Sequence, residues 1–218
     1  MKIPQILRDS FLSSLIVSFF FLTIFTYFEP RAVVAQTSAS DEVVVTLNVT
    51  AGIAIDSPSD VTMSRNIGMA ANTAVASSTW TVTTNNITGY NLTVKASTTP
   101  AMQQNATTTI DDYAIGSPTP WSVAAGTANF GFSAYGIDVD TGTWGSGSDC
   151  QSTVHVPSTT LNYLGFTTSS SSPVVANRTA TTTYAGSPTT VCFAVQQNAF
   201  FIPSGTYTAV ITATAVTI

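Results

Sequence analysis

Charged side chains are scarce in this 218-residue chain, which is 44% hydrophobic and only 8% charged. A globular protein ordinarily carries about 25% charged residues. The six Lys and Arg residues are scattered along the chain, whereas a protein that binds nucleic acid needs them clustered to contact phosphates. The composition therefore excludes nucleic acid from the expected partners.

Residues for acid–base and nucleophilic catalysis are also few. The single histidine is His155, and the sequence has no Gly-x-Ser-x-Gly motif around a nucleophilic serine. Asp111 and Asp112 are adjacent, so in a strand they would point apart and would not form the carboxylate pair of a glycosidase. We therefore expect a protein that is not an enzyme and that needs no cofactor.

One long apolar run is present, at the N-terminal end. Residues 11–28 contain no charge, Lys2 and Arg8 precede them, and Val33-Val34-Ala35 resembles a signal-peptidase site. This pattern predicts a signal peptide over residues 1–35. The alternative is a retained membrane anchor, because 18 apolar residues lie at the short end of a spanning helix. Under both interpretations residues 36–218 are exported to the extracellular space or the cell surface, and membrane contact is limited to residues 11–28 if they are not cleaved.

Without residues 1–35, the chain has even fewer basic residues. Residues 36–218 keep three basic residues and nine acidic ones, a net charge of -6, and they include 36 Thr and 21 Ser. Neutral hydroxyl groups must therefore keep the surface hydrated, and β-branched Thr suits the pleated surface of a sheet. In an exported chain the only two cysteines, Cys150 and Cys192, predict one disulfide, because a metal site would need further Cys or His ligands nearby.

Apolar residues alternate with polar ones over most of the exported chain, which predicts β-strands. The clearest examples are residues 42–50, the pair 79–84 and 90–97, which we expect to form a hairpin, and the closing segment 206–218. Shorter candidates are residues 52–56, 61–65, 128–139, 160–166 and 191–197. Residues 98–127 and 167–188 are predicted to be surface loops or to contain short strands. About 180 residues with this pattern make one all-β domain, residues 36–218.

An acidic loop precedes Cys150. Asp138, Asp140 and Asp149 are spaced like the first, third and twelfth ligands of a calcium loop. However, the fifth and sixth positions are Gly142 and Thr143, and no helices are expected around the loop. Two interpretations stay open: a calcium site, or a Gly-rich polar loop that leads to the disulfide.

Three tryptophans differ in their surroundings. Trp80 alternates with strand residues and is predicted to lie in the core. Trp121 and Trp144 fall in predicted loops, where their rings either pack locally or stack on a sugar or a protein partner.

Three segments resemble exported bacterial surface proteins: LNVTAGIAIDSPSDVTMS, TWTVTTNNITGYNLTVKAS and PSGTYTAVITATAVTI. They are similar to the WxL-type cell-surface domains and to the spore-coat and fimbrial group, in which a Gly-x-Tyr turn leads into a long terminal strand. The resemblance spans residues 46–218. It implies an immunoglobulin-like or pilin-like antiparallel β-sandwich without catalytic residues.

Together these observations predict a non-enzymatic secreted or cell-surface protein with a structural or adhesive role, as in a subunit of a coat or fibre. Its expected partners are components of the cell envelope or copies of itself. The alternative is an extracellular carbohydrate-binding module that uses Trp121 or Trp144, with calcium at Asp138, Asp140 and Asp149.

Overall fold

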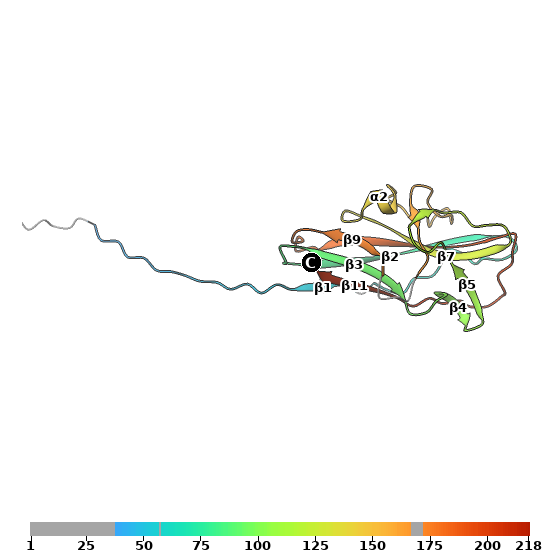
Figure 1. Ribbon diagram of the computed structural model, residues 1–218, viewed down its shortest axis with the longest axis horizontal. Coiled ribbons are helices and arrows are strands. Elements are labelled where there is room, and N and C mark those ends of the chain that lie inside the picture. The colour runs from blue at the N-terminus through green and yellow to red at the C-terminus, as the bar shows by residue number, and fades with distance from the viewer. Residues whose placement is uncertain (1–37, 57, 167–171) are drawn as a thin grey trace, which may run out of the picture. The chain divides into compact units, whose positions relative to one another are not determined.

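The computed structural model describes residues 38–56, 58–166 and 172–218. The predicted signal peptide, residues 1–35, and the alternative anchor, residues 11–28, lie outside this part of the chain. Residues 49–218 form one compact unit (Figure 1), and residues 38–48 belong to the other unit of the chain. Within the described ranges, no helix is long and apolar enough to cross a membrane.

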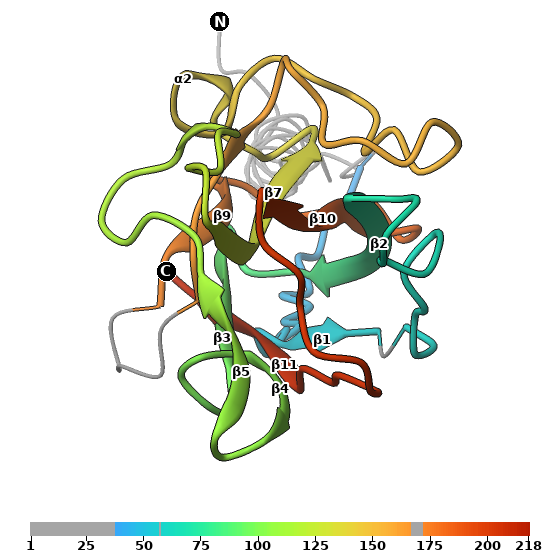
Figure 2. The same ribbon diagram turned by 90° about the vertical axis from the view of Figure 1, so that its right-hand side faces the viewer.

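A six-stranded sheet is the larger of the two main sheets. Its order is β1 (Ile53–Ile55), β2 (Thr73–Thr84), β10 (Ser187–Asn198), β7 (Thr127–Gly136), β5 (Thr108–Asp112) and β4 (Met102–Asn105). The long strand β10 lies at its centre and pairs antiparallel with β2 on one side and with β7 on the other (Figure 2). Only the short contact between β5 and β7 is parallel.

A three-stranded sheet contributes the other side of the core. Its order is β11 (Ile211–Thr217), β3 (Tyr90–Ala96) and β9 (Val174–Arg178), and all its pairs are antiparallel (Figure 1). A small third sheet pairs β6 (Thr119–Pro120) with β8 (Asn162–Tyr163), and the one described helix is the single turn α2 (Thr141–Trp144). The all-β prediction is confirmed.

The main core lies between these two sheets. The inward residues of β3, predicted from the alternation, are all fully buried: Tyr90, Leu92, Val94 and Ala96. They belong to the same apolar cluster as Trp80 of β2, which confirms the core position predicted for this tryptophan. Phe132 of β7 packs against Phe166 with ring centroids 4.3 Å apart. Burying such aromatic rings supplies much of the driving force for folding.

Two predicted strands are absent from the described residues. Residues 42–50 alternate well but have no helix or strand, and their five Val and Leu side chains are 74–88% exposed. Residues 61–65 also form no strand. Residues 42–50 pair with no strand of the described residues, and a strand needs a partner for its backbone groups. Residues 61–65 do lie beside β2, but the Ser64 amide makes a single backbone bond to Val75 and no ladder forms.

The predicted hairpin of residues 79–84 and 90–97 is wrong in its pairing, although both segments are strands. β2 pairs with β1 and β10, whereas β3 pairs with β11 and β9. Residues 85–89 therefore carry the chain from one sheet to the other. The predicted loops contain β4, β5 and β9, short strands that alternation alone did not locate.

Gly89, the last residue of this crossover, offers a test of the fold. Its φ is +83°, and a Cβ atom there would overlap the carbonyl oxygen of Arg178 in β9. Gly126 has a similar φ of +84° but no atom within 4 Å of that position. Gly126→Ala should lower the free energy of unfolding by about 1 kcal/mol, from backbone strain alone. Gly89→Ala should cost clearly more, as measured by chemical denaturation, and equal losses would contradict this packing.

Candidate functional site

The cysteine pair is placed as predicted. Cys192 lies on β10 and Cys150 lies in the loop after α2, with their Cα atoms 5.3 Å apart in a disulfide. Val191, Phe193 and Val195 face the main core, as the sequence predicted, and Cys192 faces the opposite side. There the disulfide belongs to a second apolar cluster, with Tyr163 and Leu161, that fixes the loop over the six-stranded sheet.

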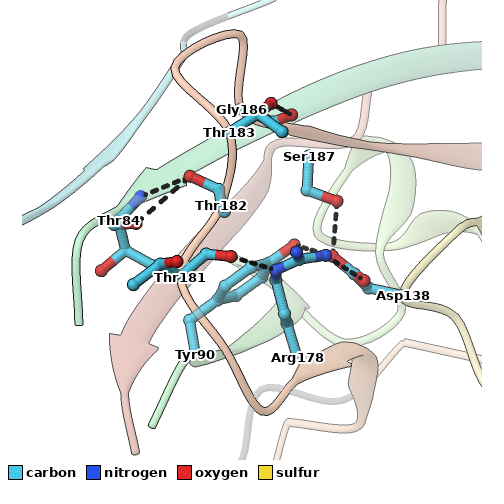
Figure 3. Close-up of polar contacts among 9 residues, drawn as sticks. All are labelled: Thr84, Tyr90, Asp138, Arg178, Thr181, Thr182, Thr183, Gly186 and Ser187. Carbon is cyan, nitrogen blue, oxygen red and sulfur yellow. Dashed lines mark hydrogen bonds and ion pairs between the residues drawn. The ribbon is translucent and has the colours of Figure 1, made fainter. Parts of the chain in front are cut away.

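Asp138 is the centre of a polar cluster that joins the two main sheets (Figure 3). Its carboxylate accepts a hydrogen bond from the Tyr90 hydroxyl at 2.9 Å and an ion-paired one from Arg178 Nη1 at 3.1 Å. The Ser187 hydroxyl donates a third, short hydrogen bond. Tyr90 and Arg178 belong to the three-stranded sheet, and Ser187 begins β10, so the cluster links strands of both sheets.

The polar groups of the cluster have hydrogen-bond partners and are partly shielded from water. The Asp138 side chain is 8% exposed, and Arg178 also donates from Nε to the Thr181 carbonyl oxygen at 2.9 Å. Burial raises the pKa of Tyr90 to about 12, so the phenol keeps its proton and acts as a donor. The carboxylate of Asp138 and the guanidinium of Arg178 are thus paired with each other, and the cluster connects the two sheets.

The three aspartates of the candidate calcium loop are not brought together. Asp138 is engaged by Arg178, Asp140 caps α2, and Asp149 accepts a hydrogen bond from the Gln151 amide at 3.0 Å. Hydrogen bonds from Thr143 and Gly142 lower the pKa of Asp140. Within residues 38–56, 58–166 and 172–218, no three His, Cys, Asp or Glu side chains are grouped to hold a metal ion.

The two candidate ligand-binding tryptophans occupy different environments. Trp144 is not in a loop: it ends α2, is 1% exposed, and donates from Nε1 to the Val174 carbonyl oxygen at 3.1 Å. Its ring is therefore inaccessible to a ligand. Trp121 is half-buried, stacks on Tyr113 with centroids 4.5 Å apart, and donates from Nε1 to Gln196 at 2.6 Å.

The outer edge of β11 is a further candidate site. The ladder to β3 continues beyond β11, where Ser97 donates to Val210 and Ile218 donates to Gly89. Because antiparallel ladder bonds recur at every second residue, the even-numbered residues of β11 bond to β3 and the odd-numbered ones point away. Those outward groups belong to Ile211, Ala213, Ala215 and Thr217, and they have no hydrogen-bond partner among the described residues. β1 lies near β11, but no ladder joins the two strands.

Side chains along this edge form an incompletely covered apolar strip. The strip consists of Tyr207, Ala209, Ile211, Ala213 and Ala215, which pack against the core but stay only partly buried. Alternate residues on the other face, such as Thr212 and Thr214, are exposed. The final 21 residues of the sequence contain no charge. A paired neighbour could satisfy the backbone groups and cover the strip at the same time.

Asp112 is a half-buried acid that sequence reasoning placed in a loop. It ends β5, and its Oδ1 accepts a hydrogen bond from the Ala101 amide at 3.2 Å. Its Oδ2 is buried without a partner among the described residues. Burial raises the pKa of Asp112 from 3.8 to about 6, because the charged form loses solvation.

The polar cluster around Asp138 was also missed by sequence reasoning. One signal was available, since Arg178 is among only three basic residues of residues 36–218 and Asp138 is among nine acidic ones. Comparison with known proteins adds no assignment: no family model, curated protein or solved structure matches this chain.

The Asp138 cluster leads to a stability prediction. Asp138→Ala leaves Arg178 without its partner and two hydroxyls without their acceptor, so the free energy of unfolding should fall by about 2–3 kcal/mol. Asp140→Ala, two residues away, removes only the cap of a single helical turn and should cost about 1 kcal/mol. Denaturant titration measures both variants, and a similar loss in the two would show that the cluster does not hold the sheets together.

Asp112 leads to a prediction of pH dependence. Its raised pKa means that the folded protein binds this proton more tightly than the unfolded chain, so stability is lost as the pH rises from about 4 through about 6. Asp112→Asn should therefore be more stable than the parent protein above pH 7, with the difference shrinking toward pH 4. Thermal unfolding across this range checks it, with exposed Asp60→Asn as the control. A parent protein that is more stable than Asp112→Asn above pH 7 would reverse the expected sign.

Proposed function

We propose that this protein is a non-enzymatic structural or adhesive protein of the cell surface that works by associating with copies of itself. The observation that carries the proposal is the outer edge of β11. Unpaired backbone groups and an incompletely covered apolar strip lie along one strand, in a stretch without charge. Soluble proteins usually protect such an edge with charges, proline or a covering segment, because it invites pairing with another chain.

Export to the cell surface is part of the proposal, and the sequence supports it. The basic and apolar start of the chain resembles a signal peptide, and a disulfide suits an oxidising compartment. The exported part is rich in hydroxyl groups and poor in charge. Its contacts with a partner would therefore be made through strands and loops and not through charged groups. We also propose that the two sheets form an immunoglobulin-like or pilin-like sandwich. The support is their shared core and largely antiparallel pairing.

Carbohydrate binding is the second candidate, and it now depends on Trp121 alone. The ring is half-buried and held by Tyr113 and Gln196, so any exposed part of it would meet a sugar in a fixed orientation. A glycan array with the parent protein and with Trp121→Ala tests this candidate. Binding that is lost in Trp121→Ala would support it, and no binding by the parent protein would eliminate it.

Self-association and location are measured together to test the main proposal. The full chain is expressed in an exporting host, and the mature N-terminal residue and the cell fraction are determined. Sedimentation of the purified protein should show that the associated fraction increases with protein concentration. Protein that remains inside the cell, or stays monomeric at all concentrations, would contradict the proposal.

Variants of β11 show whether its edge is responsible. Ala213→Pro removes an outward N–H group without removing a ladder bond to β3, and should weaken association at least tenfold, about 1.4 kcal/mol. Thr214→Lys places a charge on the edge strand as a second block. Val154→Lys is the control, since it replaces an exposed apolar residue elsewhere. Thermal unfolding confirms that each variant is folded. Unchanged association in both edge variants would eliminate β11 as the contact.

A further inference from the structure

We infer that the occupant of the β11 edge is β11 of a second copy, paired antiparallel about a two-fold axis at Thr214. This inference rests on the proposed function and names the partner strand and its register. It would join the two three-stranded sheets into one continuous sheet, β9-β3-β11 followed by β11-β3-β9 of the second copy. An interface of this kind uses the same surface on both molecules and closes at two copies.

The backbone groups fix the register. The outward groups of β11 are at Ile211, Ala213, Ala215 and Thr217, which lie symmetrically around Thr214. With the axis at Thr214, Ile211 pairs with Thr217 of the other copy, and Ala213 pairs with its Ala215. Each of these residues then both donates and accepts, so every outward group of β11 is used. A shift of the axis by one residue would place an end of the pairing outside β11.

Side chains suit the same register. On the inner face, small Ala213 and Ala215 meet at the centre, so the two apolar strips join without a large side chain between them. On the outer face Thr214 lies opposite Thr214 of the second copy, and Thr212 lies opposite Val216. Cross-strand Thr pairs and β-branched pairs are favourable in antiparallel sheets. The strips, partly buried in one molecule, would cover each other in the pair.

Electrostatic repulsion does not oppose this pairing. Residues 198–218 contain no charged side chain. The nearest charge on the paired strand is Lys95 of β3, opposite Thr212. Three strand spacings would separate the two copies of β3, about 14 Å, which exceeds the screening length of about 8 Å at physiological salt.

Another segment that could pair with β11 is residues 42–50 of a neighbouring copy. That segment has the right alternation, and it is exposed and without secondary structure. Ordering it would cost about 1–2 kcal/mol for each residue, whereas β11 is already held in the extended form by β3. Pre-organisation therefore favours β11 as the partner.

A cysteine scan of the outer face tests the register. Thr214→Cys places two thiols opposite each other on the axis, at a non-hydrogen-bonded position with Cα atoms about 4.5 Å apart, which suits a disulfide. Thr212→Cys is the matched control: it is equally exposed, but its two copies would be about 13 Å apart along the strands. Under mild oxidation of the purified protein, with the native disulfide intact, Thr214→Cys should form covalent dimers on the order of tenfold faster.

The possible results separate this inference from the function on which it rests. Association with equal cross-linking of the two variants would overturn the register and leave the structural role intact. Loss of association in the double variant Val45→Asp and Leu47→Asp, without cross-linking of Thr214→Cys, would identify residues 42–50 as the partner strand and overturn the inference. A protein that never associates would contradict both proposals.

Discussion

The core of residues 49–218 lies between a three-stranded sheet and a six-stranded sheet, and β11 is an edge strand of the smaller one. Its inward side chains reach the core but are only partly buried, and among the described residues no strand is hydrogen-bonded to its outer side. The same geometry leaves the odd-numbered backbone groups of β11 without partners among the described residues. Apolar surface and hydrogen-bonding capacity therefore occur together on one strand, where a second strand would satisfy both.

Most charged residues of the described chain are exposed, but two of them connect the main sheets. Asp138 and Arg178 form an ion pair that also engages Tyr90 and Ser187, and so connects the two main sheets. On the other side of the six-stranded sheet, the disulfide and its apolar neighbours hold the long loop after α2.

Alternation predicted β3, β10 and much of β7 and β11, because one face of each strand lies against a core. It failed where the outcome depended on partners distant in the sequence. Residues 42–50 have the pattern but no partner strand among the described residues, and β2 and β3 follow each other but belong to different sheets. Cys150 and Cys192 could be paired by elimination. The neighbours of Asp138, which lie on separate strands, could not be identified from spacing, and neither could the burial of Trp144.

Amide hydrogen exchange along β11, measured residue by residue at low and high protein concentration, tests the central claim most directly. Because only the even-numbered amides are bonded to β3, Thr212, Thr214 and Val216 should be protected at every concentration. The amides of Ile211, Ala213, Ala215 and Thr217 should exchange rapidly in dilute protein and become protected as molecules associate. Rapid exchange of these four amides in fully associated protein would show that the edge of β11 is not the contact.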